Sequence, residues 1–147
     1  MEEEPKRKVG GKKMTSRVRK NKVLIVDNNE RVLPIFHQVL EKAGFDTYST
    51  WSGREALALL ESQEFDVLLV DDYLPDLHTN AFLHRVNQLP IQPRIVVMQA
   101  SAPTVGQLRQ YILPGARAVV RKHHIAEVCK AVGSCCTDEP LAKTCAN

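Results

Sequence analysis

Residues 65–72 read Phe65-Asp66-Val67-Leu68-Leu69-Val70-Asp71-Asp72, an almost continuous apolar run that ends in two carboxylates. A run of this kind, rather than an apolar–polar alternation, is typical of a strand buried on both faces of a parallel sheet. A second such run, Lys22-Val23-Leu24-Ile25-Val26, also ends in an acid, Asp27. Because ligands of open parallel sheets bind at the carboxyl ends of the strands, both runs predict where a functional site would lie.

Segments of helical periodicity separate the strands. Apolar residues recur at helical spacing from Glu30 to Ala43, and Gly44 follows in the position of a C-cap. Ser52 and Glu55 match a capping box at the start of a helix that we expect to reach Ser62. Further strands are expected at 45–50, 95–98 and 118–120, and further helices near 80–88, 104–113 and 125–132. The alternation predicts a doubly wound (βα)5 protein of the α/β class.

The charge of the chain is unevenly distributed along its 147 residues, which suffice for one domain with one packed core. Residues 1–22 hold nine basic and three acidic side chains, a net charge of +6, and the remainder therefore carries −3 of the total of +3. Because the first segment lacks large apolar groups, we expect residues 1–21 to be a disordered basic tail. Residues 22–133 are the expected domain, and residues 134–147 a flexible C-terminal tail.

Several protein classes are disfavoured. No stretch approaches the roughly 20 apolar residues that a membrane span needs, and the N-terminus has no apolar region typical of a secretory signal. The cysteines Cys129, Cys135, Cys136 and Cys145 all lie near the C-terminus, which favours reduced thiols in an intracellular protein.

Pro5-Lys6-Arg7-Lys8 resembles a nuclear import signal, and the alternative is a solvated arm with nonspecific affinity for polyanions. We therefore expect the nucleus, the cytoplasm or both.

The polar side chains at the expected strand ends are Asp27, Asn28, Asp71, Asp72, Gln99 and Lys122. Carboxylates from neighbouring strands beside an ammonium group form a hard-oxygen site suited to Mg²⁺, with one cation available for an anion. The chain contains neither of the two common Gly-rich phosphate loops, so nucleotide binding has no local support.

Three segments in order resemble the receiver domain of two-component response regulators. Val23–Asn28 resembles the first strand and acidic pair of the family, and residues 69–75 resemble its phosphoacceptor strand, in which the acceptor Asp stands four residues before Pro. Pro114–Lys122 resembles the run in which Gly-Ala precedes an apolar strand and a lysine. The resemblance covers Val23 to Val132, and it implies the flavodoxin-like strand order 2-1-3-4-5.

The resemblance implies a phosphoacceptor signalling protein and not an enzyme with an external substrate. Asp71 would accept a phosphoryl group from phosphohistidine in a His-to-Asp phosphorelay, supplied by a histidine phosphotransfer protein or a histidine kinase. Lys122 and Mg²⁺ would screen the repulsion between the two anions. Asp27, Asp71, the backbone carbonyl of Tyr73 and, more weakly, Asn28 are the implied ligands of the metal.

The chain departs from the family at positions that matter for signalling. Asn28 stands in place of a second acid, which predicts weak Mg²⁺ binding. Gln99 stands where the family has Ser or Thr, and its amide would donate to a phosphoryl oxygen. Val119 replaces the rotating aromatic residue of the fifth strand. These departures leave open a pseudo-receiver that binds its partner without phosphate.

Two further questions stay open at this point. Asp72 is the alternative acceptor, although side chains alternate along a strand, so that Asp71 and Asp72 do not both face the site, and the spacing to Pro75 favours Asp71. The basic tail resembles that of small receiver-only regulators of plants, which implies hormone signalling of the cytokinin type. The downstream protein is unknown, and we expect no specific DNA binding, so that any effect on transcription would be indirect.

Overall fold

Five strands and five helices alternate along residues 19–137, the part of the chain that the computed structural model describes. The elements are β1 Lys22–Val26, α1 Leu33–Lys42, β2 Asp46–Thr50, α2 Gly53–Ser62, β3 Val67–Asp71, α3 Thr79–Val86, β4 Arg94–Gln99, α4 Val105–Ile112, β5 Ala116–Arg121 and α5 Ile125–Cys135. All strand pairs are parallel, and the sheet has the order β2-β1-β3-β4-β5. The predicted (βα)5 class and the strand order are both confirmed.

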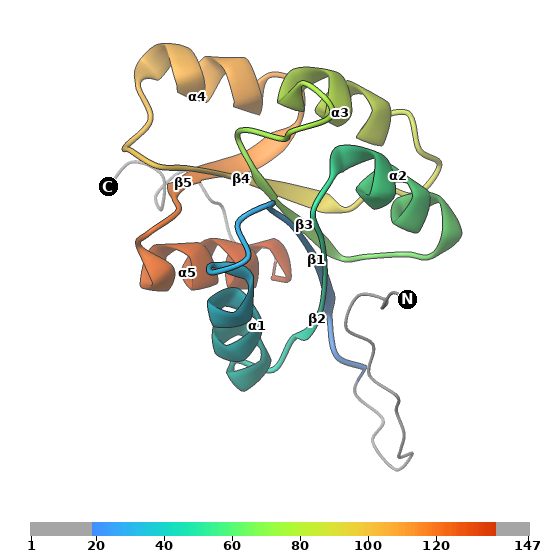
Figure 1. The fold of residues 1–147 in the computed structure, drawn as a ribbon, viewed down its shortest axis with the longest axis vertical. Coiled ribbons are helices and arrows are strands. Elements are labelled where there is room, and N and C mark those ends of the chain that lie inside the picture. Colours follow the sequence, from blue (N-terminus) through green and yellow to red (C-terminus); the bar gives the residue numbers. More distant parts are fainter. Residues whose placement is uncertain (1–18, 138–147) are drawn as a thin grey trace.

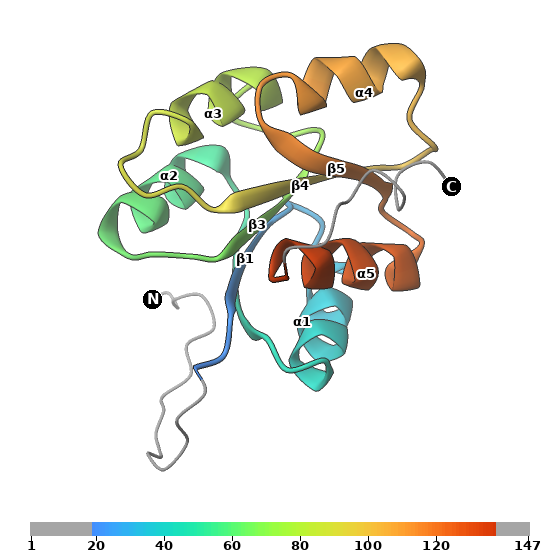
Figure 2. The same cartoon turned by 180° about the vertical axis from the view of Figure 1, so that it is seen from behind.

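The helices cover the sheet on both faces, with α1 and α5 on one side and α2, α3 and α4 on the other (Figure 1, Figure 2). Side chains of each central strand alternate between the two layers: Val23 and Ile25 pack toward α1 and α5, whereas Leu24 and Val26 pack toward α2 and α3. A strand with two buried faces has no solvent-facing side, and this is why the sequence of β1 and β3 is continuously apolar.

Two helix boundaries differ from the expected ones for identifiable reasons. Helix α1 begins at Leu33 rather than at Glu30, which places Pro34 in the first turn. A helix that began at Glu30 would bring the Pro34 ring against the carbonyl of Glu30. Helix α5 continues to Cys135, three residues beyond the expected end at Val132, because the Cys135 side chain is buried and Arg94 donates a hydrogen bond to its carbonyl.

The capping box expected at the start of α2 is half formed. The Ser52 hydroxyl accepts from the Glu55 N–H at 3.1 Å, as predicted. The Glu55 carboxylate accepts instead from the Thr50 hydroxyl at the end of β2. The side chain that would close the box locally therefore ties α2 to the sheet.

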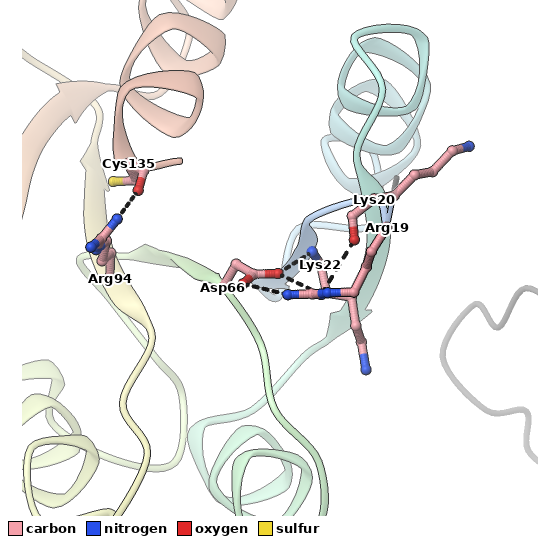
Figure 3. A network of polar contacts seen from close by, with 6 residues as sticks. All are labelled: Arg19, Lys20, Lys22, Asp66, Arg94 and Cys135. Atoms are coloured by element: carbon pink, nitrogen blue, oxygen red, sulfur yellow. Dashed lines mark hydrogen bonds and ion pairs between the residues drawn. The ribbon is translucent and has the colours of Figure 1, made fainter. Parts of the chain in front are cut away.

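Polar contacts join the amino ends of the strands, at the edge of the sheet opposite to their carboxyl ends (Figure 3). The Asp66 carboxylate accepts from the Lys22 N–H at 2.8 Å and from the Arg19 guanidinium at 3.2 Å. The Asn21 carbonyl accepts from the Asp46 N–H at 2.9 Å, so residues 19–21 of the expected tail contact the domain. Residues 1–18 and 138–147, which make up the rest of both expected tails and include the Pro5–Lys8 cluster, lie outside the described residues.

Within residues 19–137, each helix is too short or too polar to cross a membrane.

Substitution by alanine should affect stability differently at Gly115, in the connection from α4 to β5, and at Gly133, in α5. Gly115 has φ +126°, and a Cβ there would lie 3.0 Å from the Asn87 amide. Gly133 lies in α5, and a Cβ there would meet nothing within 4 Å. We expect Gly115→Ala to lower the free energy of unfolding by about 1–3 kcal/mol, because the alanine is strained at this φ. Gly133→Ala should leave it unchanged or raise it by about 0.5–1 kcal/mol. Urea denaturation measures both, and equal effects of the two substitutions would contradict the assigned backbone geometry.

Candidate functional site

Two carboxylates and one ammonium group meet at the carboxyl edge of the sheet. Asp27 directly follows β1, Asp71 is the last residue of β3, and Lys122 directly follows β5. Lys122 Nζ lies 2.8 Å from Asp27 Oδ2 and 3.1 Å from Asp71 Oδ1, so that it bridges the two acids. We call this group the carboxylate–lysine cluster. The sequence prediction that these three side chains lie together is therefore matched by their geometry.

Main-chain hydrogen bonds fix the positions of the cluster. The Asp27 N–H donates to the Thr50 carbonyl at 3.1 Å, and the Lys122 N–H donates to the Gln99 carbonyl at 2.7 Å. The Asp27 Oδ1 atom accepts from the Asn29 N–H at 2.9 Å, which orients the carboxylate within its own turn. The main chains of Asp27 and Lys122 are thus held by the neighbouring strand, and Asp71 is paired with Met98 within the sheet.

The cluster is nearly excluded from solvent. Asp27 is completely buried, Asp71 is 6% exposed, and the Lys122 side chain is 11% exposed. Burial and the charge of Asp27 raise the pKa of Asp71 to about 6, although Lys122 opposes this shift. Burial alone would lower the pKa of Lys122, but the hydrogen bonds and charges of the two acids raise it above its ordinary value. Two negative groups share one positive group, so the site has a deficit of positive charge.

The segment that follows Asp71 is anchored at several points. The Asp72 N–H donates to the Met98 carbonyl at 2.8 Å, and the Asp72 carbonyl accepts from the Thr79 hydroxyl at 2.9 Å. Asp76 accepts from the N–H groups of Gly53 and Arg54 at 2.9 and 3.0 Å, which joins this segment to the start of α2. Such anchoring keeps the main chain after Asp71 at a defined place beside the cluster.

The other predicted site residues lie around the cluster in different ways. Asn28 is exposed at the start of the β1–α1 connection. The Tyr73 side chain is 65% exposed, so only its backbone carbonyl is suited to a ligand role. Asp72 is half-buried, and burial is the main reason why its pKa is raised. Of these two neighbours, Asp71 is the one whose ion pair with Lys122 the structure shows.

Gln99 is buried at the end of β4, but its amide faces α4. The Nε2 atom donates to the Ser101 carbonyl at 3.0 Å and to Gln107 Oε1 at 3.1 Å. Both amide hydrogens therefore have acceptors away from the cluster.

Sequence reasoning missed Gln107 and Tyr111, both on α4. Tyr111 is 7% exposed and packs in the same cluster of buried side chains as Val119. Its pKa is raised by burial and by the negative charges of Asp72 and Asp71. Gln107 and Tyr111 are four residues apart on a helix that the sequence did predict, and this spacing places them on one face. That spacing is the signal that would have suggested them.

The ligand set available to a metal is small. Within residues 19–137 there is no cluster of three or more His, Cys, Asp and Glu side chains arranged to hold a metal ion. Asp27 and Asp71 are the two carboxylates that converge, and both contact Lys122. A cation bound here would need backbone and water oxygens to complete its shell. Mg²⁺, which keeps several waters in protein sites, fits such a set better than zinc does.

The chain is similar in sequence to response regulators. The family model of the response regulator receiver domain matches residues 23–132. The polar-differentiation response regulator DivK of Brucella ovis is 39% identical over 54 residues, which cover 37% of this chain and 44% of DivK. The alkaline phosphatase synthesis transcriptional regulatory protein PhoP of Bacillus subtilis is 28% identical over 79 residues, which cover 54% of this chain and 33% of PhoP. The chain thus spans less than half the length of these relatives.

Solved structures of the same fold are also similar. The chemotaxis response regulator CheY4 of Vibrio cholerae superposes with a TM-score of 0.74 at 22% identity, over 80% of this chain and 99% of that one. A response regulator protein from Burkholderia pseudomallei, solved with a phosphorylated aspartic acid, a calcium ion and citrate, has a TM-score of 0.66 at 20% identity over 79% of this chain and 66% of that one. At these identities the likeness shows the fold.

Since the family model spans about three quarters of the sequence, the chain belongs to the response regulator receiver domain family of two-component signalling.

Proposed function

We propose that Asp71 accepts a phosphoryl group from a phosphohistidine donor in a His-to-Asp phosphorelay. The observation that carries this proposal is the bridge from Lys122 to both Asp71 and Asp27 at the carboxyl edge of the sheet. A carboxylate oxygen of Asp71 attacks the phosphorus atom, the P–N bond breaks, and the imidazole leaves and takes up a proton. The product is an aspartyl phosphate.

Lys122 supports this step electrostatically. Attack of one anion on another is slow unless positive charge screens their repulsion, and the ammonium group lies 3.1 Å from the attacking carboxylate. Because Lys122 is held by Asp27 as well, it stays at the site when an oxygen of Asp71 enters the mixed-anhydride bond of the acyl phosphate. Gln99 would add a donor for a phosphoryl oxygen if its amide turned from α4 toward Asp71.

Mg²⁺ is the cofactor of the proposal. Two buried carboxylates share a single ammonium group. Burial and the charge of Asp27 raise the pKa of Asp71, and a divalent cation would offset both effects. Asp27, Asp71, the Tyr73 carbonyl and Asn28 are the groups that would hold it. Bound Mg²⁺ would supply positive charge to the transferring phosphoryl oxygens.

The setting of the relay is proposed on the sequence. A histidine phosphotransfer protein or a histidine kinase would be the donor, and an unknown downstream protein the recipient of the signal. We place the protein inside the cell, in the nucleus, the cytoplasm or both. The domain, expected at residues 22–133 and extended in the structure by the contacts of residues 19–21 and by α5 to Cys135, lies between a basic tail and a C-terminal tail. The hormone setting, of the cytokinin type, rests on the resemblance of this arrangement to small plant regulators, and its effect on transcription would be indirect.

A pseudo-receiver is the second candidate, and one observation favours it. The Gln99 amide is engaged by Gln107 and Ser101, and Val119 offers no aromatic side chain to follow a phosphoryl group. A partner surface that works without phosphate would be unaffected by Asp71→Asn, whereas the phosphoacceptor function would be lost.

The phosphoacceptor function predicts a specific adduct. After incubation with acetyl phosphate and Mg²⁺, the intact protein should gain the mass of one phosphoryl group. Asp71→Asn should remove the adduct, because an amide is not a nucleophile toward phosphorus. Asp72→Asn is the matched control and should keep it. Intact-mass spectrometry measures all three, and a wild-type protein without an adduct would rule out the function.

The missing second acid predicts a gain-of-binding variant. Asn28→Asp adds a carboxylate beside Asp27, and a unit charge at about 4 Å from a cation contributes at least about 1 kcal/mol in a solvent-exposed setting. We therefore expect Mg²⁺ to bind at least about fivefold more tightly to this variant by calorimetric titration. Asn29→Asp is the control that tests whether any additional charge near Asp27 tightens Mg²⁺ binding. The Asn29 side chain is a suitable control position because it accepts from the Arg31 N–H within its own turn. An unchanged affinity in Asn28→Asp would remove residue 28 from the metal site.

The raised pKa of Asp71 predicts how stability depends on pH in EDTA. Folding favours the protonated carboxyl, so this contribution is complete below pH 3.8 and is lost as the pH rises through about 6. Asp71→Asn does not ionise, and at pH 7.5 it should be more stable than the wild type by about 1–3 kcal/mol, with a smaller difference at pH 4.5. Urea denaturation at both pH values measures this.

Asp76→Asn provides the opposite case. Burial alone would raise the pKa of Asp76, but the N–H groups of Arg54 and Gly53 lower it below its ordinary value. This substitution should therefore destabilise the protein at pH 7.5. For Asp71→Asn, a free energy of unfolding at pH 7.5 equal to or below that of the wild type would show that the ionised Asp71 carboxylate does not destabilise the fold.

A further inference from the structure

The Gln99 side chain is held between two acceptors at the start of α4. Gln99 is 2% exposed, and its amide donates to the Ser101 carbonyl and to Gln107 Oε1. A primary amide has two hydrogens, so this geometry uses its whole donor capacity. The Gln99 Oε1 atom is buried and accepts no hydrogen bond from the described residues. The side chain is therefore fixed through its nitrogen alone.

Gln107 connects this amide to the cap of α4. Its Oε1 atom also accepts from the Thr104 N–H at 3.0 Å, while its own N–H donates to the Thr104 hydroxyl at 3.1 Å. These two bonds form the capping box of α4. The same oxygen thus serves the first turn of the helix and the end of β4, and the box itself does not need Gln99.

The main chain of Gln99 lies beside the carboxylate–lysine cluster. Its carbonyl accepts from the Lys122 N–H at 2.7 Å, and Met98, the residue before it, is paired with Asp71 across the sheet. Met98 packs toward α1 and α5, so Gln99 points to the opposite face, beneath α4. Asp71 shares the face of its partner Met98, so the Gln99 amide would have to turn around the end of β4 to meet a phosphoryl oxygen carried by Asp71.

We infer that Gln107 is a positioning residue for the phosphoryl site: it holds the Gln99 amide at the start of α4 and so withholds this donor from a phosphoryl group on Asp71. The inference rests on the proposed phosphoacceptor function. A phosphoryl group on Asp71 and the Gln107 oxygen compete for the same N–H. When the phosphoryl oxygen takes it, the bond between β4 and the first turn of α4 is lost.

The competition is reciprocal, as any coupling between two sites must be. Whatever weakens the Gln99–Gln107 bond strengthens phosphoryl binding, and a phosphoryl group loosens the contact of α4 with the sheet. Tyr111 lies on the same face of α4 as Gln107 and is buried, so it would move with the helix that Gln107 anchors.

The test uses beryllofluoride with Mg²⁺, because beryllofluoride binds reversibly to a carboxylate oxygen and mimics a phosphoryl group. Gln107→Met removes the acceptor and keeps the length and helix propensity of the side chain. We expect its dissociation constant for beryllofluoride to fall about three- to tenfold below the wild-type value, which is the factor that one hydrogen bond supplies. Titration followed by ¹⁹F NMR measures both constants.

Two controls separate this role from a merely structural one. Thr104→Ala weakens the same cap but leaves the Gln107 oxygen in place, so its dissociation constant should stay within about twofold of the wild type. In a Gln99→Met background, Gln107→Met should bring no gain, since there is no amide to release. A gain that persists there, or equal constants for Gln107→Met and the wild type, would overturn the inference alone. Failure of the wild type to bind beryllofluoride and to form the acetyl phosphate adduct would overturn the proposed function, and the inference with it.

Discussion

The burial of two carboxylates around one ammonium group is the constraint on which the rest of this structure depends. Lys122 reaches both Asp27 and Asp71, but a single positive charge does not neutralise two negative ones. Burial, and after it the charge of Asp27, raises the pKa of Asp71 to about 6. Outside the folded protein, the two carboxylates would move apart or become hydrated. The surrounding sheet, buried on both faces, offsets the repulsion and holds the three groups within contact distance. The repulsion between the two carboxylates destabilises the unphosphorylated protein. The same excess of negative charge favours a reaction that brings an electrophile and positive charge to Asp71.

Parallel topology is what brings the three residues together. They come from positions 27, 71 and 122, and they meet because β1, β3 and β5 all end at the same edge of the sheet. The opposite edge carries no comparable cluster of buried charge within the described residues; there Asp66 and Arg94 serve as hydrogen-bond partners of the main chain and of Arg19 (Figure 3). The fold thus separates its structural polar groups from its candidate reactive ones, and it does so by strand direction alone.

The periodicity of the sequence predicted the sheet, and the residues that end the strands predicted the Asp27–Asp71–Lys122 cluster. The strand order was implied by the resemblance to receiver domains. The sequence did not predict where flexible polar side chains find partners. Glu55 was expected to close a local capping box and instead accepts from Thr50, and Gln99 was assigned a place beside Asp71 while its amide donates to Gln107. Choices of this kind depend on acceptors that are distant in sequence and differ little in energy, whereas a buried strand has no alternative. The end of α5 was missed for the same reason, since Arg94 on β4 supplies its last partner.

The central claim is that the charge arrangement at the strand ends makes Asp71 the acceptor. The most direct test is chemical mapping of the phosphorylated residue after transfer from a phosphohistidine donor. Borohydride reduces an aspartyl phosphate to homoserine, and peptide mass spectrometry then locates the converted position. The account predicts homoserine at position 71 and unmodified aspartate at positions 27 and 72. Homoserine at position 72, or a phosphoryl group carried by a residue outside the carboxylate–lysine cluster, would contradict it.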